Sequence, residues 1–179
     1  MKKILFVIPF LSSGGAERVV SIWASGMAKQ GADVHLLVFY PVENGYKIDD
    51  KVVLHKIRSN QSEYDKLTKW EKLTEMRKAF KDIKPDVVLP FITHVGLMVS
   101  IAKIGLPIKI VETIRIDPKY SPPKIFKRVL RNLSVFFANR CIVQNKKQLA
   151  YFPTWMHKRI KVFANPISND FVESEKVFI

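Results

Sequence analysis

The sequence predicts an α/β fold in which a mainly parallel, doubly wound sheet carries helices on both faces. Short apolar runs alternate with longer amphipathic stretches along the chain, and strands that alternate with helices imply crossover connections and a parallel sheet. The 179 residues, 47% apolar and 26% charged, are of ordinary composition. They suit one domain with a single hydrophobic core and exclude wholesale disorder. We therefore expect a Rossmann-like domain.

The strands are expected where apolar residues run together over a short stretch. Ile4–Ile8 is a continuous apolar run that Pro9 ends, as in a strand buried on both faces. Val52–Ile57 alternates only weakly, which is typical of an edge strand. Further strands are expected at Val34–Tyr40, Val87–Leu89, Ile108–Val111, Cys141–Val143 and Ile160–Phe163.

The helices are expected where apolar residues recur at a spacing of three or four. Ala16–Lys29 carries such a stripe, and Gly31 follows it as a C-terminal stop. Tyr64–Lys84 has the same spacing among mixed charges, which indicates one solvated helix. Further helices are expected at Val95–Lys103, Pro123–Phe137 and Lys146–Tyr151.

Cysteine content and the two ends of the chain bound the remaining possibilities. The single cysteine, Cys141, excludes an internal disulfide and a multi-thiolate zinc site, and we expect no metal. The first apolar run is short for a signal peptide, so we expect a cytoplasmic protein without a spanning helix. Turn residues begin at Asn165-Pro166. We expect residues 1–165 to form one lobe and residues 166–179 to form a hinge that begins a second, C-terminal lobe.

A glycine turn joins the first expected strand to the first helix. Gly14 and Gly15 let the backbone come close to a ligand, and the free amides of a helix N-terminus favour an anion. The alternative is a tight turn that binds nothing. The spacing matches neither a dinucleotide fingerprint nor a P-loop. The second strand also ends in Val38-Phe39-Tyr40-Pro41, which places no acid for a ribose.

Five short segments along the chain form an ordered set of motifs. They are Ser13-Gly14-Gly15-Ala16-Glu17-Arg18, Lys84-Pro85-Asp86-Val87-Val88, Thr113-Ile114-Arg115-Ile116-Asp117-Pro118, Cys141-Ile142-Val143-Gln144-Asn145 and Phe163-Ala164-Asn165-Pro166-Ile167. In this order they resemble the N-terminal lobe of family 4 retaining glycosyltransferases of the GT-B fold, in the capsule and lipid-linked oligosaccharide branch.

The resemblance implies the acceptor-binding half of a two-lobe enzyme that transfers a sugar from a nucleotide-sugar. In such enzymes the C-terminal lobe holds most of the donor, including through a Glu-x7-Glu motif that the acids after Asp117 do not form. The fragment alone is then expected to be inactive. No cofactor is implied. The implied partners are the nucleotide-sugar, a glycan or polyprenyl-phosphate-linked acceptor, the C-terminal lobe and an anionic membrane surface.

The same resemblance names residues that bind the substrate or the donor phosphate. These are Gly14, Gly15, Arg18, Arg115 and Asp117. Arg115 is suited to a phosphate because of its forked guanidinium. The alternative is a structural ion pair between Arg115 and either Asp117 or Glu112. Ile114 and Ile116 replace the Glu and Asn that are frequent in the family, so no polar role is carried over to them.

His94 follows the fourth expected strand, at the sheet edge where doubly wound folds bind ligands. It is a candidate catalytic residue that hydrogen-bonds a sugar hydroxyl or steadies the departing phosphate. The alternative is a histidine at a helix N-terminus that takes no part in chemistry.

The chain carries a formal charge of +14 and has a pI near 9.9. Eleven Lys and Arg and no Asp or Glu lie between Lys119 and Lys161. Within this segment, cations alternate with bulky apolar residues over Pro122–Phe137, which indicates a helix at an anionic bilayer. The alternative is a core-facing helix with a solvated basic face. The expected membrane-facing residues are Lys124, Lys127, Arg128 and Arg131.

Two other functions remain open. A basic module that binds nucleic acid would suit the charge, but the chain has no RNP-type motif, zinc spacing or clear helix-turn-helix. A stand-alone phosphate-binding α/β protein would suit the glycine turn. We expect the transferase, peripheral on the inner face of the cell membrane, and we do not expect nucleic acid as a partner.

Overall fold

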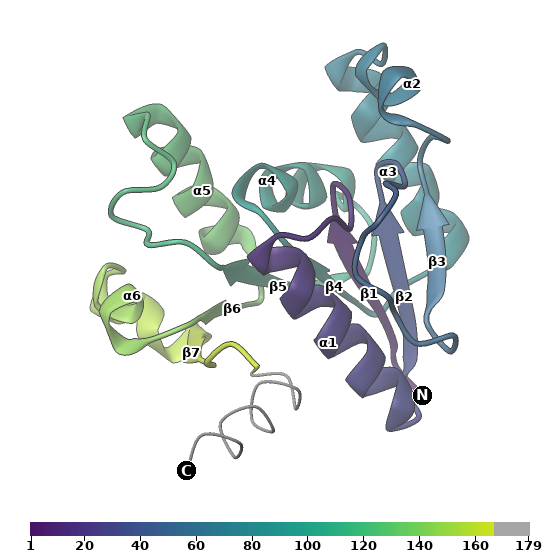
Figure 1. Cartoon of the computed structure of the whole chain (residues 1–179). Coiled ribbons are helices and arrows are strands. Elements are labelled where there is room, and N and C mark those ends of the chain that lie inside the picture. The colour runs from purple at the N-terminus through teal and green to yellow at the C-terminus, as the bar shows by residue number, and fades with distance from the viewer. Residues whose placement is uncertain (167–179) are drawn as a thin grey trace.

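The computed structural model describes residues 1–166 and contains the predicted doubly wound α/β fold (Figure 1). All paired strands are parallel, in the order β3-β2-β1-β4-β5-β6-β7. The strands are β1 (Lys3–Ile8), β2 (Asp33–Val38), β3 (Val53–Lys56), β4 (Val87–Pro90), β5 (Lys109–Ile114), β6 (Arg140–Val143) and β7 (Ile160–Val162). The edge position predicted for the strand near Val52–Ile57 is therefore confirmed by β3.

Six α-helices and one 3-10 helix connect these strands within the described residues. They are α1 (Gly15–Lys29), α2 (Gln61–Asp65), α3 (Lys69–Ile83), α4 (Thr93–Ala102), α5 (Ile125–Phe137), α6 (Lys146–Ala150) and η1 (Thr154–Arg159). The prediction of a single helix over Tyr64–Lys84 is wrong, because a non-helical segment separates α2 from α3. Thr68 and Glu71 form a capping box there, which starts a new helix.

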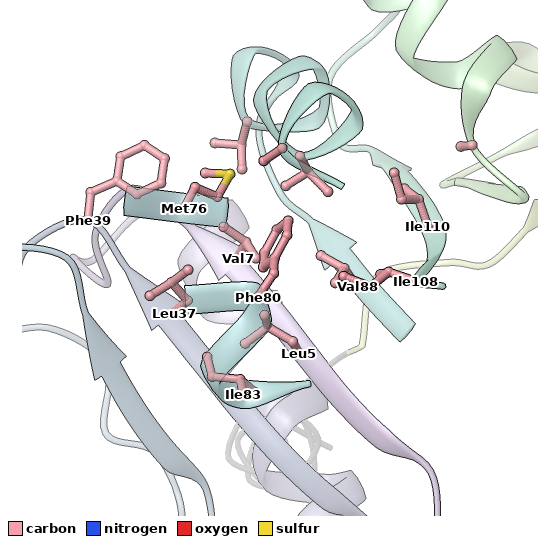
Figure 2. Close-up of a cluster of buried hydrophobic side chains, with 14 of the residues drawn as sticks. Leu5, Val7, Leu37, Phe39, Met76, Phe80, Ile83, Val88, Ile108 and Ile110 are labelled. Atoms are coloured by element: carbon pink, nitrogen blue, oxygen red, sulfur yellow. The ribbon is translucent and has the colours of Figure 1, made fainter. Parts of the chain in front are cut away.

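Side chains of β1 alternate between two cores. Leu5 and Val7 pack with α3 and α4 on one face, whereas Phe6 and Ile8 pack with α1 on the other. Figure 2 shows the first of these cores, in which Phe80 of α3 lies among side chains of the central strands. A strand buried on both faces needs the continuous apolar run that β1 has. A smaller third core lies under α5 and the last helices.

The order of the strands positions the site. The chain builds β1, β2 and β3 outward in one direction and then returns to place β4 on the other side of β1. The loops that leave β1 and β4 therefore diverge at the carboxyl edge of the sheet, and this divergence opens a crevice where doubly wound proteins bind ligands. The predicted hinge after Asn165 lies mostly outside the described residues.

Candidate active-site cleft

A cavity of about 460 Å³ opens at this carboxyl edge, beside the first turn of α1. Segments far apart in sequence line it: Gly15 and Glu17 from α1, Thr113 and Arg115 at the end of β5, Gln144 after β6, and Asn165 after β7. The predicted glycine turn and the predicted arginine thus meet in one cleft. Gln144 and Asn165 belong to segments of the family resemblance, but sequence reasoning assigned them no role.

Gly14 and Gly15 occupy the turn for different structural reasons. Gly14 is the N-cap of α1, and a Cβ there would collide with the Glu17 carboxylate. Gly15 is exposed, and a Cβ there would meet nothing within 4 Å. No side chain caps this helix, so the amides of its first turn lack intrahelical partners. The fold requires the close approach at Gly14, whereas the bare backbone at Gly15 only leaves the cleft open.

The neighbouring side chains of Glu17 and Arg18 in this first turn have different environments. Glu17 is buried, and the Ser12 hydroxyl donates to its Oε1 at 3.4 Å. Its negative charge lies at the positive end of the helix, which stabilises α1. Arg18 is exposed and is absent from the lining of the cleft. The structure therefore brings Gly15 to the cleft but leaves the predicted phosphate-binding Arg18 outside it.

Arg115 is held at the cleft by aromatic side chains. Its guanidinium carbon lies 4.2 Å from the Trp23 ring centroid and 5.3 Å from that of Phe91. Nη1 donates to Asn165 Oδ1 at 2.9 Å. Nε and Nη2 are shielded from water and have no hydrogen-bond partner among residues 1–166. Burial lowers the pKa of Arg115 to about 10, so the group stays charged at neutral pH.

Neither ion pair considered for Arg115 forms within the described part of the chain. Asp117 instead accepts from the Lys119 amide at 2.8 Å, is exposed, and does not line the cleft. Glu112 lies within β5, three residues before Arg115, and is fully buried. Asp117 thus caps a local turn, and no carboxylate of residues 1–166 forms an ion pair with Arg115.

His94 lines a second cavity of about 580 Å³, between α3, α4 and α5. Four cations share this lining: Lys69, Lys72, Lys127 and Arg131. The His94 side chain is accessible, yet its surroundings desolvate the ring and lower its pKa, and Lys127 lowers it further. The imidazole is therefore neutral at pH 7, which suits a hydrogen bond to a hydroxyl better than an ion pair with a phosphate.

Ile92 separates the two cavities and lines both. Its φ of 74° is in a region that β-branched residues rarely adopt. Such strain costs on the order of 1–3 kcal/mol and is frequent at functional sites. Together with Ile116, this residue makes the two cavities neighbours at one edge of the sheet.

The prediction that Arg131 faces a membrane is wrong. Arg131 is 1% exposed, and its guanidinium donates to the carbonyl oxygens of Pro118, at 2.7 Å, and Ser121. Arg128 is half-buried and donates to Pro122 O at 2.8 Å and to Pro123 O at 3.0 Å. A guanidinium carries five donors, and here those donors hold the loop before α5. Only Lys124 and Lys127 of the predicted set are exposed.

Two further observations concern residues 1–166 as a whole. No group of three or more His, Cys, Asp and Glu side chains in this part of the chain is placed to hold a metal ion. In the same residues, no helix has the length and hydropathy that a bilayer span requires.

Comparisons with known proteins agree with this architecture. The chain is 31% identical, over 169 residues, to the GalNAc-alpha-(1->4)-GalNAc-alpha-(1->3)-diNAcBac-PP-undecaprenol alpha-1,4-N-acetyl-D-galactosaminyltransferase of Campylobacter jejuni. The match covers 93% of this chain and 46% of that enzyme. The chain therefore spans about half the length of the curated relative it matches.

Solved structures share the fold at low sequence identity. Anabaena Alr3699/HepE in complex with UDP and glucose superposes with a TM-score of 0.68 at 15% identity, over 95% of this chain and 46% of that one. The lipopolysaccharide outer core galactosyltransferase WaaB gives 0.66 at 14%, over 94% and 46%. Sucrose-phosphate synthase of Thermosynechococcus elongatus gives 0.69 at 13%, over 92% and 48%. The chain thus has the fold of one lobe of a GT-B glycosyltransferase.

A family model described as "Glycosyl transferase 4-like" matches residues 4–145, which include the glycine turn, Arg115 and Gln144. This match covers most of the chain, including strands β1 to β6 and the cleft residues up to Gln144. The chain therefore belongs to the glycosyl transferase 4-like family.

Proposed function

We propose that this chain is the acceptor-binding half of a retaining glycosyltransferase. The reaction would move a sugar from a nucleotide-sugar to a glycan or polyprenyl-phosphate-linked acceptor at the inner membrane surface. A C-terminal lobe would close over the cleft and hold most of the donor, and residues 1–165 would form the acceptor lobe. Family membership supports the reaction class, and the Campylobacter relative, whose acceptor is undecaprenol-linked, supports the acceptor class.

The observation that carries this proposal is the Arg115 guanidinium. Two of its nitrogens are buried without a partner among the described residues, and Arg115 lines the same cleft as the exposed backbone of Gly15. Leaving such donors unpaired costs on the order of 1–3 kcal/mol, and a bound anion would recover that energy. A guanidinium fork and helix-terminal amides in one cleft favour a phosphate oxygen. We propose that Arg115 and the Gly14-Gly15 turn contact the phosphorylated end of a substrate there.

We propose that the acceptor binds in the second cavity. Its wall is largely apolar, with Leu97, Met98 and Ile101 of α4, and lysines stand at its rim. A polyprenyl-phosphate-linked acceptor matches this lining, because its apolar chain suits the apolar wall and its phosphate groups suit the lysines. The neutral His94 would hydrogen-bond a sugar hydroxyl of an acceptor in the second cavity. No cofactor or metal is part of this proposal, because a nucleotide-sugar already carries an activated leaving group.

Binding of an acceptor analogue tests the proposal on the 179-residue chain. Isothermal titration with a short-chain prenyl diphosphate-linked sugar should show binding, and Arg115→Lys should weaken it by about tenfold, or about 1.4 kcal/mol. Arg140→Lys is the matched control, because Arg140 is exposed and the one side-chain hydrogen bond that it makes among residues 1–166 is to the Asn139 carbonyl. Equal affinities of wild type and Arg115→Lys, with unchanged melting temperatures, would contradict the role of Arg115.

The glycine turn is tested by Gly15→Leu. The new side chain projects into open space in the cleft, so we expect weaker binding of the same analogue and an unchanged melting temperature. The lobe by itself should show no sugar transfer from UDP-sugars. Turnover by this chain alone would show a self-sufficient enzyme instead.

A further inference from the structure

Arg115 is held at the cleft by parts of the chain that lie far apart in sequence. Its guanidinium stacks on Trp23 of α1, with 4.2 Å between the guanidinium carbon and the ring centroid. Its carbonyl oxygen accepts from Gln144 Nε2 at 2.9 Å, which fixes the backbone just after β5. Its Nη1 donates to Asn165 Oδ1, also at 2.9 Å. The backbone, one face of the guanidinium and one of its nitrogens are thus fixed.

The donors that remain on Arg115 belong to a single edge of the guanidinium. Nε and Nη2 are the two atoms without a hydrogen-bond partner among residues 1–166. In the planar guanidinium, N–H bonds of these two nitrogens point in the same direction, so they can donate together to two oxygens of one anion. The bond from Nη1 to Asn165 uses another edge. An anion and Asn165 can therefore hold Arg115 at the same time.

The partner at position 165 is an amide and not a carboxylate. A carboxylate would accept the same hydrogen bond, but its charge would weaken the attraction between Arg115 and an anion. Asn165 instead holds the guanidinium and leaves its positive charge uncompensated. An arginine loses much rotamer freedom when a ligand immobilises it. Because Trp23 and Asn165 already immobilise Arg115, a ligand that binds there avoids most of this cost.

Asn165 lies on a segment that is itself attached to two other elements. The amide of Phe163 donates to the Val143 carbonyl at 2.8 Å, just beyond the pairing of β7 with β6. The Phe163 ring packs edge-on against Trp23, with 5.4 Å between the ring centroids. The chain thus runs from β7 toward α1 at this point (Figure 1). We call residues 163–165 the linker segment, because the proposed hinge follows it.

We propose that Asn165 is a positioning residue for Arg115, which orients the free Nε–Nη2 edge of the guanidinium toward a phosphate group of the substrate. The inference deepens the proposed function and rests on it, because it takes the phosphate site at Arg115 as given. Thermodynamic linkage makes the effect reciprocal. The factor by which Asn165 strengthens phosphate binding is also the factor by which phosphate strengthens the attachment of the linker segment. A residue with a purely structural role would not show this equality.

Isothermal titration of the 179-residue chain with inorganic pyrophosphate tests the positioning effect. Asn165→Ala should weaken binding about fivefold, which is the typical effect of freeing one flexible side chain. Asn60→Ala is the matched control. Asn60 is also exposed, its Oδ1 accepts from the Glu63 amide at 2.9 Å, and it does not line the cleft. Its affinity should equal that of the wild type, and circular dichroism checks that each variant is folded.

Two further variants show whether Asn165 acts through Arg115. When Asn165→Ala is added to Arg115→Lys, the affinity should change by less than about twofold, because the partner that Asn165 positions is already gone. Asn165→Asp keeps the hydrogen bond but introduces a negative charge. It should weaken pyrophosphate binding at least as much as Asn165→Ala does.

Amide hydrogen exchange, followed by NMR, tests the reciprocal effect on the linker segment. Saturating pyrophosphate should slow exchange of the Phe163 amide in the wild type by the same factor, about fivefold, that separates the affinities of wild type and Asn165→Ala. Exchange of this amide should not respond to pyrophosphate in Asn165→Ala. The control is the Asn139 amide, which donates to the Ile110 carbonyl at 2.9 Å at the opposite edge of the sheet. Its exchange should be unaffected in both proteins.

Two results would overturn the inference and leave the proposed function intact. One is equal affinity of wild type and Asn165→Ala when Arg115→Lys binds more weakly, and the other is exchange at Phe163 that pyrophosphate does not change. Unchanged affinity of both Arg115→Lys and Asn165→Asp would instead show that Arg115 does not bind the anion, which refutes the phosphate site of the proposed function as well. If the wild type bound no pyrophosphate, the inference would also fail, and the titration with the prenyl diphosphate-linked sugar would decide the proposed function separately.

Discussion

The buried carboxyl group of Glu112 should make this protein less stable as pH rises. Glu112 is 0% exposed, and neither carboxylate oxygen has a hydrogen-bond partner among the described residues. It packs against Gly96 of α4, where any Cβ would collide with it. Burial raises its pKa from 4.5 to about 8, and the nearby Ser134 hydroxyl, which already donates to the Arg131 carbonyl, offsets only part of this.

The sign and size of the effect follow from proton linkage. Between pH 4.5 and 8 the folded state holds the Glu112 proton and the unfolded state does not. The free energy of unfolding therefore falls by about 1.4 kcal/mol per pH unit, by about 3 kcal/mol at pH 7 and by about 5 kcal/mol above pH 8. Below pH 4.5, where Glu112 is protonated in both the folded and the unfolded state, this group causes no loss of stability. Typical domains have only about 5–15 kcal/mol in total, so the loss should be readily measured.

Glu112→Gln removes the titration while preserving size. Urea unfolding of both proteins from pH 5 to 9 gives the difference in unfolding free energy at each pH. We expect this difference to change by about 1.4 kcal/mol per unit up to pH 8 in favour of the variant, and then to level off. Glu43→Gln, at an exposed position, should show no such trend. A difference that stays flat across pH 5–8 would refute the reasoning, because it would mean that the carboxyl group ionises with ordinary ease.

Four further substitutions test the fold and the glycine turn. Phe80→Ala should lower the free energy of unfolding by about 3–5 kcal/mol in urea melts, because Phe80 is fully buried in the core of Figure 2; a loss under about 1 kcal/mol would show that the core repacks. Thr68→Ala should cost about 1 kcal/mol by removing the capping box of α3, with Thr74→Ala in the same helix as a comparison. Gly15→Ala should be neutral or stabilising by up to about 1 kcal/mol at its helical position, whereas Gly14→Ala should destabilise by about 1 kcal/mol as Glu17 is displaced; equal melting temperatures of the two variants would contradict the different roles assigned to these glycines.

Hydrophobic pattern alone predicted most of the sheet and the helices around it. Continuous apolar runs mark strands covered on both faces, and β1 satisfies this with side chains in two separate cores. The pattern missed the break between α2 and α3, because apolar spacing runs across it and only the local capping bonds of Thr68 reveal it. The 3-10 helix η1 was missed as well.

The candidate site was predicted in part. The glycine turn and Arg115 could be singled out because backbone freedom and a phosphate-binding fork are properties of residue type. The stacking of Arg115 on Trp23 and its bond to Asn165 join residues far apart in sequence, which spacing cannot reveal. Asp117 and Arg18 lie close to site residues in sequence yet point to other surroundings.

The amino-acid sequence on its own determined the class of fold, the order of its elements and the concentration of positive charge in one segment, because periodicity and composition are local properties. It also determined that α5 would be amphipathic. Which side of α5 faces inward was decided only by the tertiary structure. Carbonyl groups of the loop before α5 lie where they can accept from Arg128 and Arg131, and the buried Arg131 guanidinium would be costly to leave unpaired.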